Sequence, residues 1–97
     1  PCNKVYEDDS CLAFYDINPT CKIHVLVIPK GEYVSLVDFT QNASAQIVGE
    51  FFATVNKIAE LLELHKNGYR IVSNHGKNAN QLVDHFHVHI LGGEQLK

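Results

Sequence analysis

The order of hydrophobic patterns along the chain predicts an α+β fold, in which an antiparallel sheet of about five strands packs on one long helix. Three observations lead to this prediction. Strand-like segments fill the first third of the 97 residues, a helical repeat fills the middle, and two more strand-like segments follow. A chain of this length rarely divides, so residues 1–97 are expected to form a single domain. Because the chain opens with Pro rather than Met, its natural ends can lie outside that range.

Three strand-like segments precede the helix. Residues 3–8 and 10–15 are expected to be short strands joined by an acidic turn. Residues 22–29 are nearly all apolar, rich in β-branched side chains and ended by proline, which is typical of a buried central strand. Residues 35–39 are expected to form a turn or a loose helical segment.

A helix is predicted from Ser44 to about Lys66, because apolar residues recur there at three- and four-residue spacings. Ser44 is suited to cap its first turn, and Gly68 to stop it. The residues expected to cover the sheet are Ile47, Phe51, Val55, Ile58 and Leu62. Two strands are predicted beyond the helix, at residues 69–74 and from about Val83 to Leu91, with a polar loop between them.

The apolar surface of this helix is wider than one sheet requires. Its full stripe spans roughly 180° at 100° per residue, whereas a helix on a single sheet needs little more than about 100°. Phe52 lies on one flank of the stripe and Leu61 on the other. A homodimer, the commonest closed assembly, is therefore expected to bury the excess. Cover by loops or by further chain is the alternative.

Composition excludes several classes of protein. The net charge is −3, and the eight Lys and Arg residues are scattered, so a nucleic-acid partner is not expected. Since the chain has neither a signal peptide nor an apolar run near 18 residues, we expect a cytoplasmic protein without a membrane partner. Cys2, Cys11 and Cys21 form no C-x-x-C pair, which signals neither a disulfide framework nor a cysteine zinc site.

Three of the six histidines alternate strictly near the end of the chain. His85, His87 and His89 are expected on one face of the last strand, because strand side chains point alternately to opposite faces. The apolar residues between them, Phe86 and Val88, then face the core. Imidazoles at this spacing can converge on one substrate atom.

Three interpretations of the alternation are open. The histidines can be structural, although three titratable rings on one face crowd one another. They can hold a catalytic zinc ion, since imidazole is a common metal ligand and three histidines leave a fourth position open. We favour nucleophilic catalysis, in which a neutral imidazole attacks phosphorus and forms a covalent intermediate. Neighbouring imidazoles disfavour the charged form and donate hydrogen bonds to phosphoryl oxygens, so this chemistry needs no metal or other cofactor.

Residues 85–91 follow the pattern His-Φ-His-Φ-His-Φ-Φ, with Φ apolar, and resemble the signature of the histidine triad (HIT) family of nucleotidyl hydrolases and transferases. Residues 5–30 and the segment Asn74-x-Gly76-x-x-x-x-Gln81 resemble the same family. Gly92-Gly93 directly after the triad resembles the HINT branch, which cleaves nucleoside phosphoramidates and acyl-adenylates. The resemblance implies a HIT-like fold over residues 1–97 and a purine nucleotide substrate. A dinucleoside polyphosphate hydrolase and a nucleotide-binding module without turnover are the alternatives.

The resemblance implies a role for each of four histidines. His87 is the nucleophile that becomes nucleotidylated at the α-phosphorus. His89 contacts the phosphate oxygens and the leaving group, and His85 holds the nucleophile through its backbone carbonyl. His24 resembles a fourth histidine behind the triad that relays protons; a buried structural histidine is the alternative.

The resemblance also implies a nucleotide-binding set. Asp16 accepts hydrogen bonds from the ribose hydroxyls, and Phe14 and Ile17 line the base pocket. Asn74 and Gln81 supply polar contacts on the phosphate side. Two alternatives stay open, since Asp16 can be a turn residue and the two apolar side chains can belong to the core.

Two positions depart from the family pattern. Asn80 stands where glycine is common, and Asn tolerates positive φ better than other side chains. Leu82 stands where some members carry a phosphate-binding serine, so that contact is lost. Some bacterial members also hold a structural zinc on C-x-x-C and two histidines, which His24 and His85 would match. No such cysteine pair is present, so no metal is expected unless residues before Pro1 supply ligands.

Overall fold

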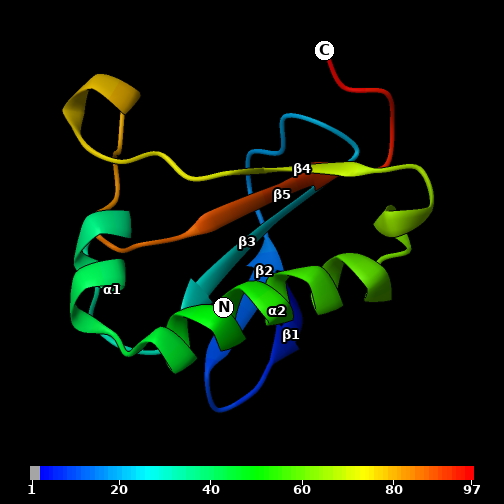
Figure 1. Ribbon diagram of the computed structural model, residues 1–97. Helices are drawn as coiled ribbons and strands as arrows, with labels where there is room; N and C mark the ends of the chain where they lie inside the picture. Colours follow the sequence, from blue (N-terminus) through cyan, green and yellow to red (C-terminus); the bar gives the residue numbers. More distant parts are fainter. Residues whose placement is uncertain (1–2) are drawn as a thin grey trace.

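The computed structural model describes residues 3–97, which leaves Cys2 outside, and it confirms the predicted α+β fold (Figure 1). One antiparallel sheet has the strand order β1-β2-β3-β5-β4. Its strands are β1 (Lys4–Glu7), β2 (Cys11–Tyr15), β3 (Ile23–Pro29), β4 (Tyr69–Val72) and β5 (Val88–Gly92). The helices are α1 (Leu36–Asn42) and α2 (Ala45–Leu61), with short 3₁₀ turns η1 (Leu64–Lys66) and η2 (Lys77–Ala79). None of the helices within residues 3–97 is long and apolar enough to cross a bilayer.

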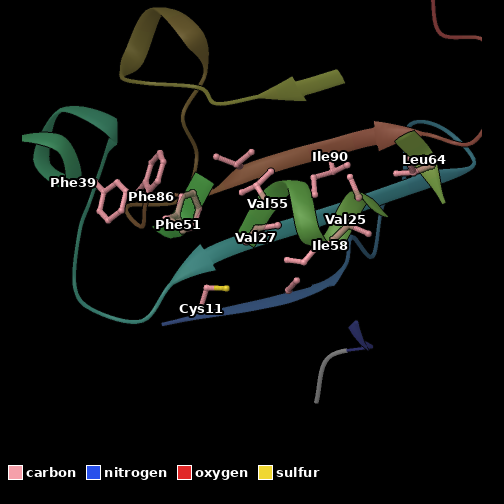
Figure 2. Packing of buried hydrophobic residues seen from close by; sticks show 13 residues of the cluster. Cys11, Val25, Val27, Phe39, Phe51, Val55, Ile58, Leu64, Phe86 and Ile90 are labelled. Atoms are coloured by element: carbon pink, nitrogen blue, oxygen red, sulfur yellow. The ribbon is translucent and has the colours of Figure 1, made fainter. Parts of the chain in front are cut away.

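Side-chain alternation in β3 and β5 gives the sheet two different faces. Val25 and Val27 of β3 and Ile90 of β5 are fully buried on the face that α2 covers (Figure 2). The residues between them point to the opposite face, where Leu26 is paired with His89. The apolar β3 segment was expected to be a buried central strand, but among residues 3–97 no helix covers the second face of the sheet. That face is left to carry the functional site.

Helix α2 begins as predicted and ends earlier. The Ser44 hydroxyl accepts a hydrogen bond from the Ile47 amide, as an N-cap does. The prediction that the helix runs to Lys66 is wrong, because Glu63 adopts φ 61° and ends the α-helical path. Leu64 then turns back into the core in η1, so a short 3₁₀ turn replaces the last helical turn.

One residue of the predicted core stripe does not reach the core. Phe51, Val55 and Ile58 are buried under α2, whereas Ile47 is 46% exposed. The rings of Phe39 and Phe86 fill the core around Phe51. Ile47 lies one helical turn before Phe51 on α2, beyond this aromatic contact.

The prediction that the last strand begins near Val83 is also wrong. The ladder between β3 and β5 starts at the pair Val27–Val88, so β5 contains only His89 of the three alternating histidines. Continuing the register would bring Pro29 opposite Phe86, and proline has no amide hydrogen to donate. The Phe86 amide donates instead to the carbonyl of Tyr33, at 2.6 Å.

The segment predicted as a turn or loose helix at residues 35–39 is the start of a regular helix, α1, with Ser35 as its N-cap. The Ser35 hydroxyl accepts a hydrogen bond from the Asp38 amide and caps it. Phe39, the buried residue of α1, stacks on Phe86 with 4.9 Å between ring centroids and meets Phe51 edge to face at 5.3 Å. This aromatic cluster joins both helices to the segment that leads into β5 (Figure 2).

Replacing Phe39 with alanine is expected to destabilise the fold by about 3–5 kcal/mol, because a fully buried ring would leave a cavity beside Phe86. Urea unfolding monitored by circular dichroism measures the change. Val37→Ala in the same helix is the control, since Val37 is largely exposed and should cost under about 1 kcal/mol. Equal losses in both variants would contradict the role given to the cluster.

Candidate active site

A cavity of about 360 Å³ lies on the face of the sheet opposite α2. Its floor is apolar and comes from Phe14 of β2 together with Leu26 and Ile28 of β3. The remaining lining residues are Asp16, Ile17, Val83, His85 and His87. The cavity therefore has one apolar wall and one edge of polar side chains, which is typical of a small-molecule site.

His87 stands at the edge of this cavity, one residue before β5. Its Nδ1 lies 2.8 Å from the backbone carbonyl oxygen of His85. A carbonyl only accepts hydrogen bonds, so Nδ1 must carry the proton and donate. In the neutral ring Nε2 then keeps its lone pair. The hydrogen bond to the His85 carbonyl thus prepares the other nitrogen of His87 as a nucleophile or base.

His24 and His89 form a hydrogen-bonded pair whose protons are fixed in the same way. The backbone amide of Thr20 donates to Nδ1 of His24, at 3.1 Å. Since Nδ1 accepts, the proton of a neutral His24 sits on Nε2, which lies 2.8 Å from Nδ1 of His89. His89 consequently accepts at Nδ1 and carries its own proton on Nε2. Its ring centroid lies 5.0 Å from that of His87.

The third ring of the triad points elsewhere. Nε2 of His85 lies 3.4 Å from the carbonyl oxygen of Pro29, at the end of β3. The alternation had suggested that the three rings converge on one atom, and the structure shows that they do not. Each has a separate backbone or side-chain partner.

Within residues 3–97, a single group of side chains has the spacing of a metal site: Asp16, His24 and His89, with ligand atoms within 4.8 Å of one another. His85 and His87 are not part of it. A metal on Nε2 of His24 would require the proton to move to Nδ1, where the Thr20 amide already donates. The hydrogen-bond directions thus favour a shared proton between these rings over a metal ion.

The sequence of residues 1–96 matches the family model described as the HIT domain. The chain belongs to the HIT family. A HIT-like protein of Azospirillum brasilense is 45% identical over 96 residues, which cover 99% of this chain and 79% of that protein. The crystal structure of a HIT family hydrolase from Legionella pneumophila superposes with a TM-score of 0.92 at 34% identity, covering 100% of this chain and 86% of the other. A histidine triad nucleotide-binding protein from Candida albicans superposes with a TM-score of 0.81 at 31% identity, covering 93% and 64%.

In this HIT domain Asp16 both shapes a turn and lies at the candidate site. Its Oδ1 accepts a hydrogen bond from the Asn18 amide at 2.8 Å, as a turn residue does. Its Oδ2 lies 3.4 Å from Nε2 of His24, and the carboxylate lines the cavity. One oxygen thus shapes the turn, while the group as a whole stays at the site.

The other sequence-predicted ligands divide into two groups. Phe14 is half-buried and Ile17 is 90% exposed, and both line the cavity. Asn74 is half-buried just beyond β4, whose Val72 pairs with His89, so it lies near the end of the sheet that leads to His87. The side-chain amide of Gln81 makes three hydrogen bonds to backbone groups and does not line the cavity.

Four contributors to the HIT site were not predicted. Leu26, Ile28 and Val83 line the cavity, and the backbone of Thr20 orients His24. The alternation within residues 22–29 could have indicated Leu26 and Ile28, since they share the face of His24. A backbone amide carries no sequence signal, so the role of Thr20 could not be read from its side chain.

The Gly-Gly pair after the triad supports the turn that contains Thr20. Gly93 has φ 82°, and a Cβ there would lie 2.6 Å from Cγ1 of Ile23. Glycine lets the chain pass close to the start of β3, where the Glu94 carboxylate accepts a hydrogen bond from the Lys22 amide at 2.5 Å. The segment after β5 therefore holds the turn whose amide sets the tautomer of His24.

The environment of His89 disfavours its charged form. Burial is the largest cause that lowers the pKa of His89 below its ordinary 6.5, and the neighbouring His87 and His24 rings lower it further. Asp16 opposes them by raising it. Neutral His89 can keep both hydrogen-bond roles, accepting from His24 and donating from Nε2.

The lowered pKa of His89 makes stability depend on pH. The unfolded chain binds this proton more readily than the folded HIT domain, so the contribution is complete above pH 6.5 and is lost as the pH falls through the folded pKa. Urea unfolding at about pH 7.5 and about pH 5 measures the loss. Between these two pH values His89→Gln is expected to lose less stability than the wild type does. The control His65→Gln, which changes an exposed histidine, is expected to lose as much stability as the wild type. The same loss in His89→Gln would contradict this assignment.

Proposed function

We propose that this HIT protein hydrolyses purine nucleoside phosphoramidates, or related nucleotide conjugates, at the α-phosphorus through a covalent nucleotide–His87 intermediate. One observation carries the proposal: the hydrogen bond from His87 Nδ1 to the His85 carbonyl leaves Nε2 as a free lone pair beside an apolar cavity of nucleoside size. The Legionella relative described as a hydrolase and the Candida relative described as nucleotide-binding support the same class of activity.

In the first step the lone pair of His87 Nε2 attacks the α-phosphorus, and the phosphorus–nitrogen bond to the leaving amine breaks. The imidazole becomes positively charged as its bond to phosphorus forms. Its Nδ1–H remains on the His85 carbonyl, which stabilises that charge. The departing nitrogen takes a proton from water.

His89 is suited to the negative charge that develops on the phosphoryl oxygens. Its Nε2–H is free to donate because Nδ1 already accepts from His24. In the second step water attacks the phosphorus and releases His87 and a nucleoside monophosphate. The electron pair of the broken phosphorus–nitrogen bond returns to Nε2 of His87, and the proton that the attacking water loses passes to solvent.

The cavity fits a nucleoside with its base on the apolar wall. Phe14, Leu26 and Ile28 offer an apolar surface to the base and no polar side chain for its edges. Asp16 is the carboxylate of the lining and is suited to accept from ribose hydroxyls. We therefore expect strong selection for the sugar and weak discrimination between adenine and guanine.

A dinucleoside polyphosphate hydrolase would use the same first step with a nucleotide as leaving group. Gly92-Gly93 favours the phosphoramidase branch, as the resemblance implies. Adenosine phosphoramidate and a dinucleoside polyphosphate, assayed side by side with and without chelator, separate these activities from each other and from metal-dependent hydrolysis. Binding of AMP without turnover of either would instead indicate a nucleotide-binding module.

His87→Ala is expected to lower kcat by on the order of a thousandfold or more, because it removes the Nε2 lone pair that attacks phosphorus. AMP binding should remain measurable. The exposed-histidine variant His65→Ala is the control and should retain full activity. Rapid quenching of the wild type with substrate should give one nucleotide adduct on the peptide of residues 83–91. An adduct elsewhere would refute the mechanism.

We also propose that the protein is a homodimer that pairs through α2 and β4. Strand β4 is an edge of the sheet, and Tyr69 on it donates to Oδ1 of Asn56 on α2 at 3.0 Å, which joins the two elements. Ile71 of β4 is 47% exposed, and Phe52 lies half-buried on the same flank of the helix. A second copy would cover these partly exposed apolar side chains.

Light scattering coupled to gel filtration tests the dimer. At tens of micromolar the wild type is expected at about twice its chain mass of 10.9 kDa. Ile71→Lys should shift the mass toward the monomer. Leu61→Lys is the control, because Leu61 is 59% exposed on the opposite flank of α2 and should leave the mass unchanged. A monomeric wild type would refute the proposal.

A further inference from the structure

The segment from Gln81 to His87 carries the proposed nucleophile but lies outside the sheet. β5 begins at Val88, so the ladder does not hold the backbone of this segment. Its C-terminal end is fixed by the Phe86 amide on the Tyr33 carbonyl and by the buried Phe86 ring. The position of His85 and His87 thus also depends on what holds the N-terminal end.

The side chain of Gln81 holds that end. Its Oε1 accepts a hydrogen bond from the Gly76 amide at 2.8 Å. Its Nε2 donates to the carbonyl oxygens of Val34, at 2.6 Å, and Val83, at 3.0 Å. This orientation of the amide is required, because a backbone amide can only donate and a carbonyl can only accept.

These contacts use the whole donor capacity of the side chain. A glutamine Nε2 has two hydrogens, and each is directed to one of the two carbonyls. Oε1 is an acceptor and cannot bind a phosphate oxygen. In this arrangement Gln81 has no hydrogen to offer a nucleotide, which differs from the phosphate contact that the resemblance implied.

The loop before Gln81 is closed on the same residue. The backbone amide of Gln81 donates to the Gly76 carbonyl at 3.1 Å. Gly76 adopts φ 82° and ψ −178°, which is confined to glycine, and Asn80 adopts φ 58°, as its tolerance of positive φ allows. One amide side chain therefore joins three backbone segments, at residues 76, 83 and 34.

We infer that Gln81 is a positioning residue, a clasp that aligns the cavity wall and the nucleophile rather than a phosphate ligand. Val83, whose carbonyl accepts a hydrogen bond from Gln81, lines the nucleoside cavity. His85, two residues further along the chain, supplies the carbonyl that orients His87. The kinetic part of this inference rests on the proposed function; the binding part does not.

Gln81→Met tests the clasp, because methionine has similar length and cannot make the three hydrogen bonds. Affinities for AMP and adenosine are expected to fall by the same factor, to within about twofold, and kcat by roughly tenfold. Gln41→Met in the exposed face of α1 is the matched control and should change neither. A selective loss of AMP affinity, with adenosine binding unchanged, would show a direct phosphate contact and overturn the inference. Unchanged affinities and kcat per folded molecule would overturn it as well.

A second measurement uses the wild type and stands even if Gln81→Met does not fold. The side-chain amide protons of Gln81, observed by NMR, should exchange slowly with solvent and keep their shifts when AMP saturates the protein. Fast exchange, or a large shift that AMP causes and adenosine does not, would refute the clasp. If the wild type turned over no nucleotide conjugate, the proposed function would fail, while the affinity ratio and the amide protons would still decide the role of Gln81.

Discussion

The antiparallel pairing of β3 with β5 is the constraint on which both faces of the molecule depend. Because the pairing places Val27 opposite Val88 and Leu26 opposite His89, one register directs the valines toward α2 and directs the leucine and the histidine to the opposite face, which carries the cavity. A shift by one residue would expose the core and bury the histidines. The stability of the hydrophobic core therefore fixes the register that the chemistry requires.

Backbone groups, rather than ionised side chains, set the protons of the site. The Thr20 amide can only donate and the His85 carbonyl can only accept, so they fix which nitrogen carries hydrogen in His24 and His87. The tautomer of His89 follows from that of His24 through their hydrogen bond, and the lowered pKa of His89 is consistent with a neutral ring. These directions prepare a lone pair on one ring and a donor on its neighbour before any substrate arrives.

Much of the fold could be predicted from periodicity, and the errors have local causes. Strong patterns gave the correct sheet, the capped start of α2 and the core residues of β3. The end of α2 was misplaced because its apolar repeat continues past Glu63, while the backbone there turns left-handed. The start of β5 was misplaced because the alternation continues beyond the point where Pro29, distant in sequence, ends the ladder.

The sequence alone determined the family and the fold class, and it indicated Asp16, His85 and His87 as site residues, because motifs and their spacing are local properties of the chain. Only the tertiary structure decided which way each ring points and what each polar side chain binds. His85 turns to Pro29 and Gln81 to Val34, partners 56 and 47 residues away. Such contacts depend on how strands and loops meet in space, and hydrogen-bond direction between distant backbone groups leaves no pattern in the sequence.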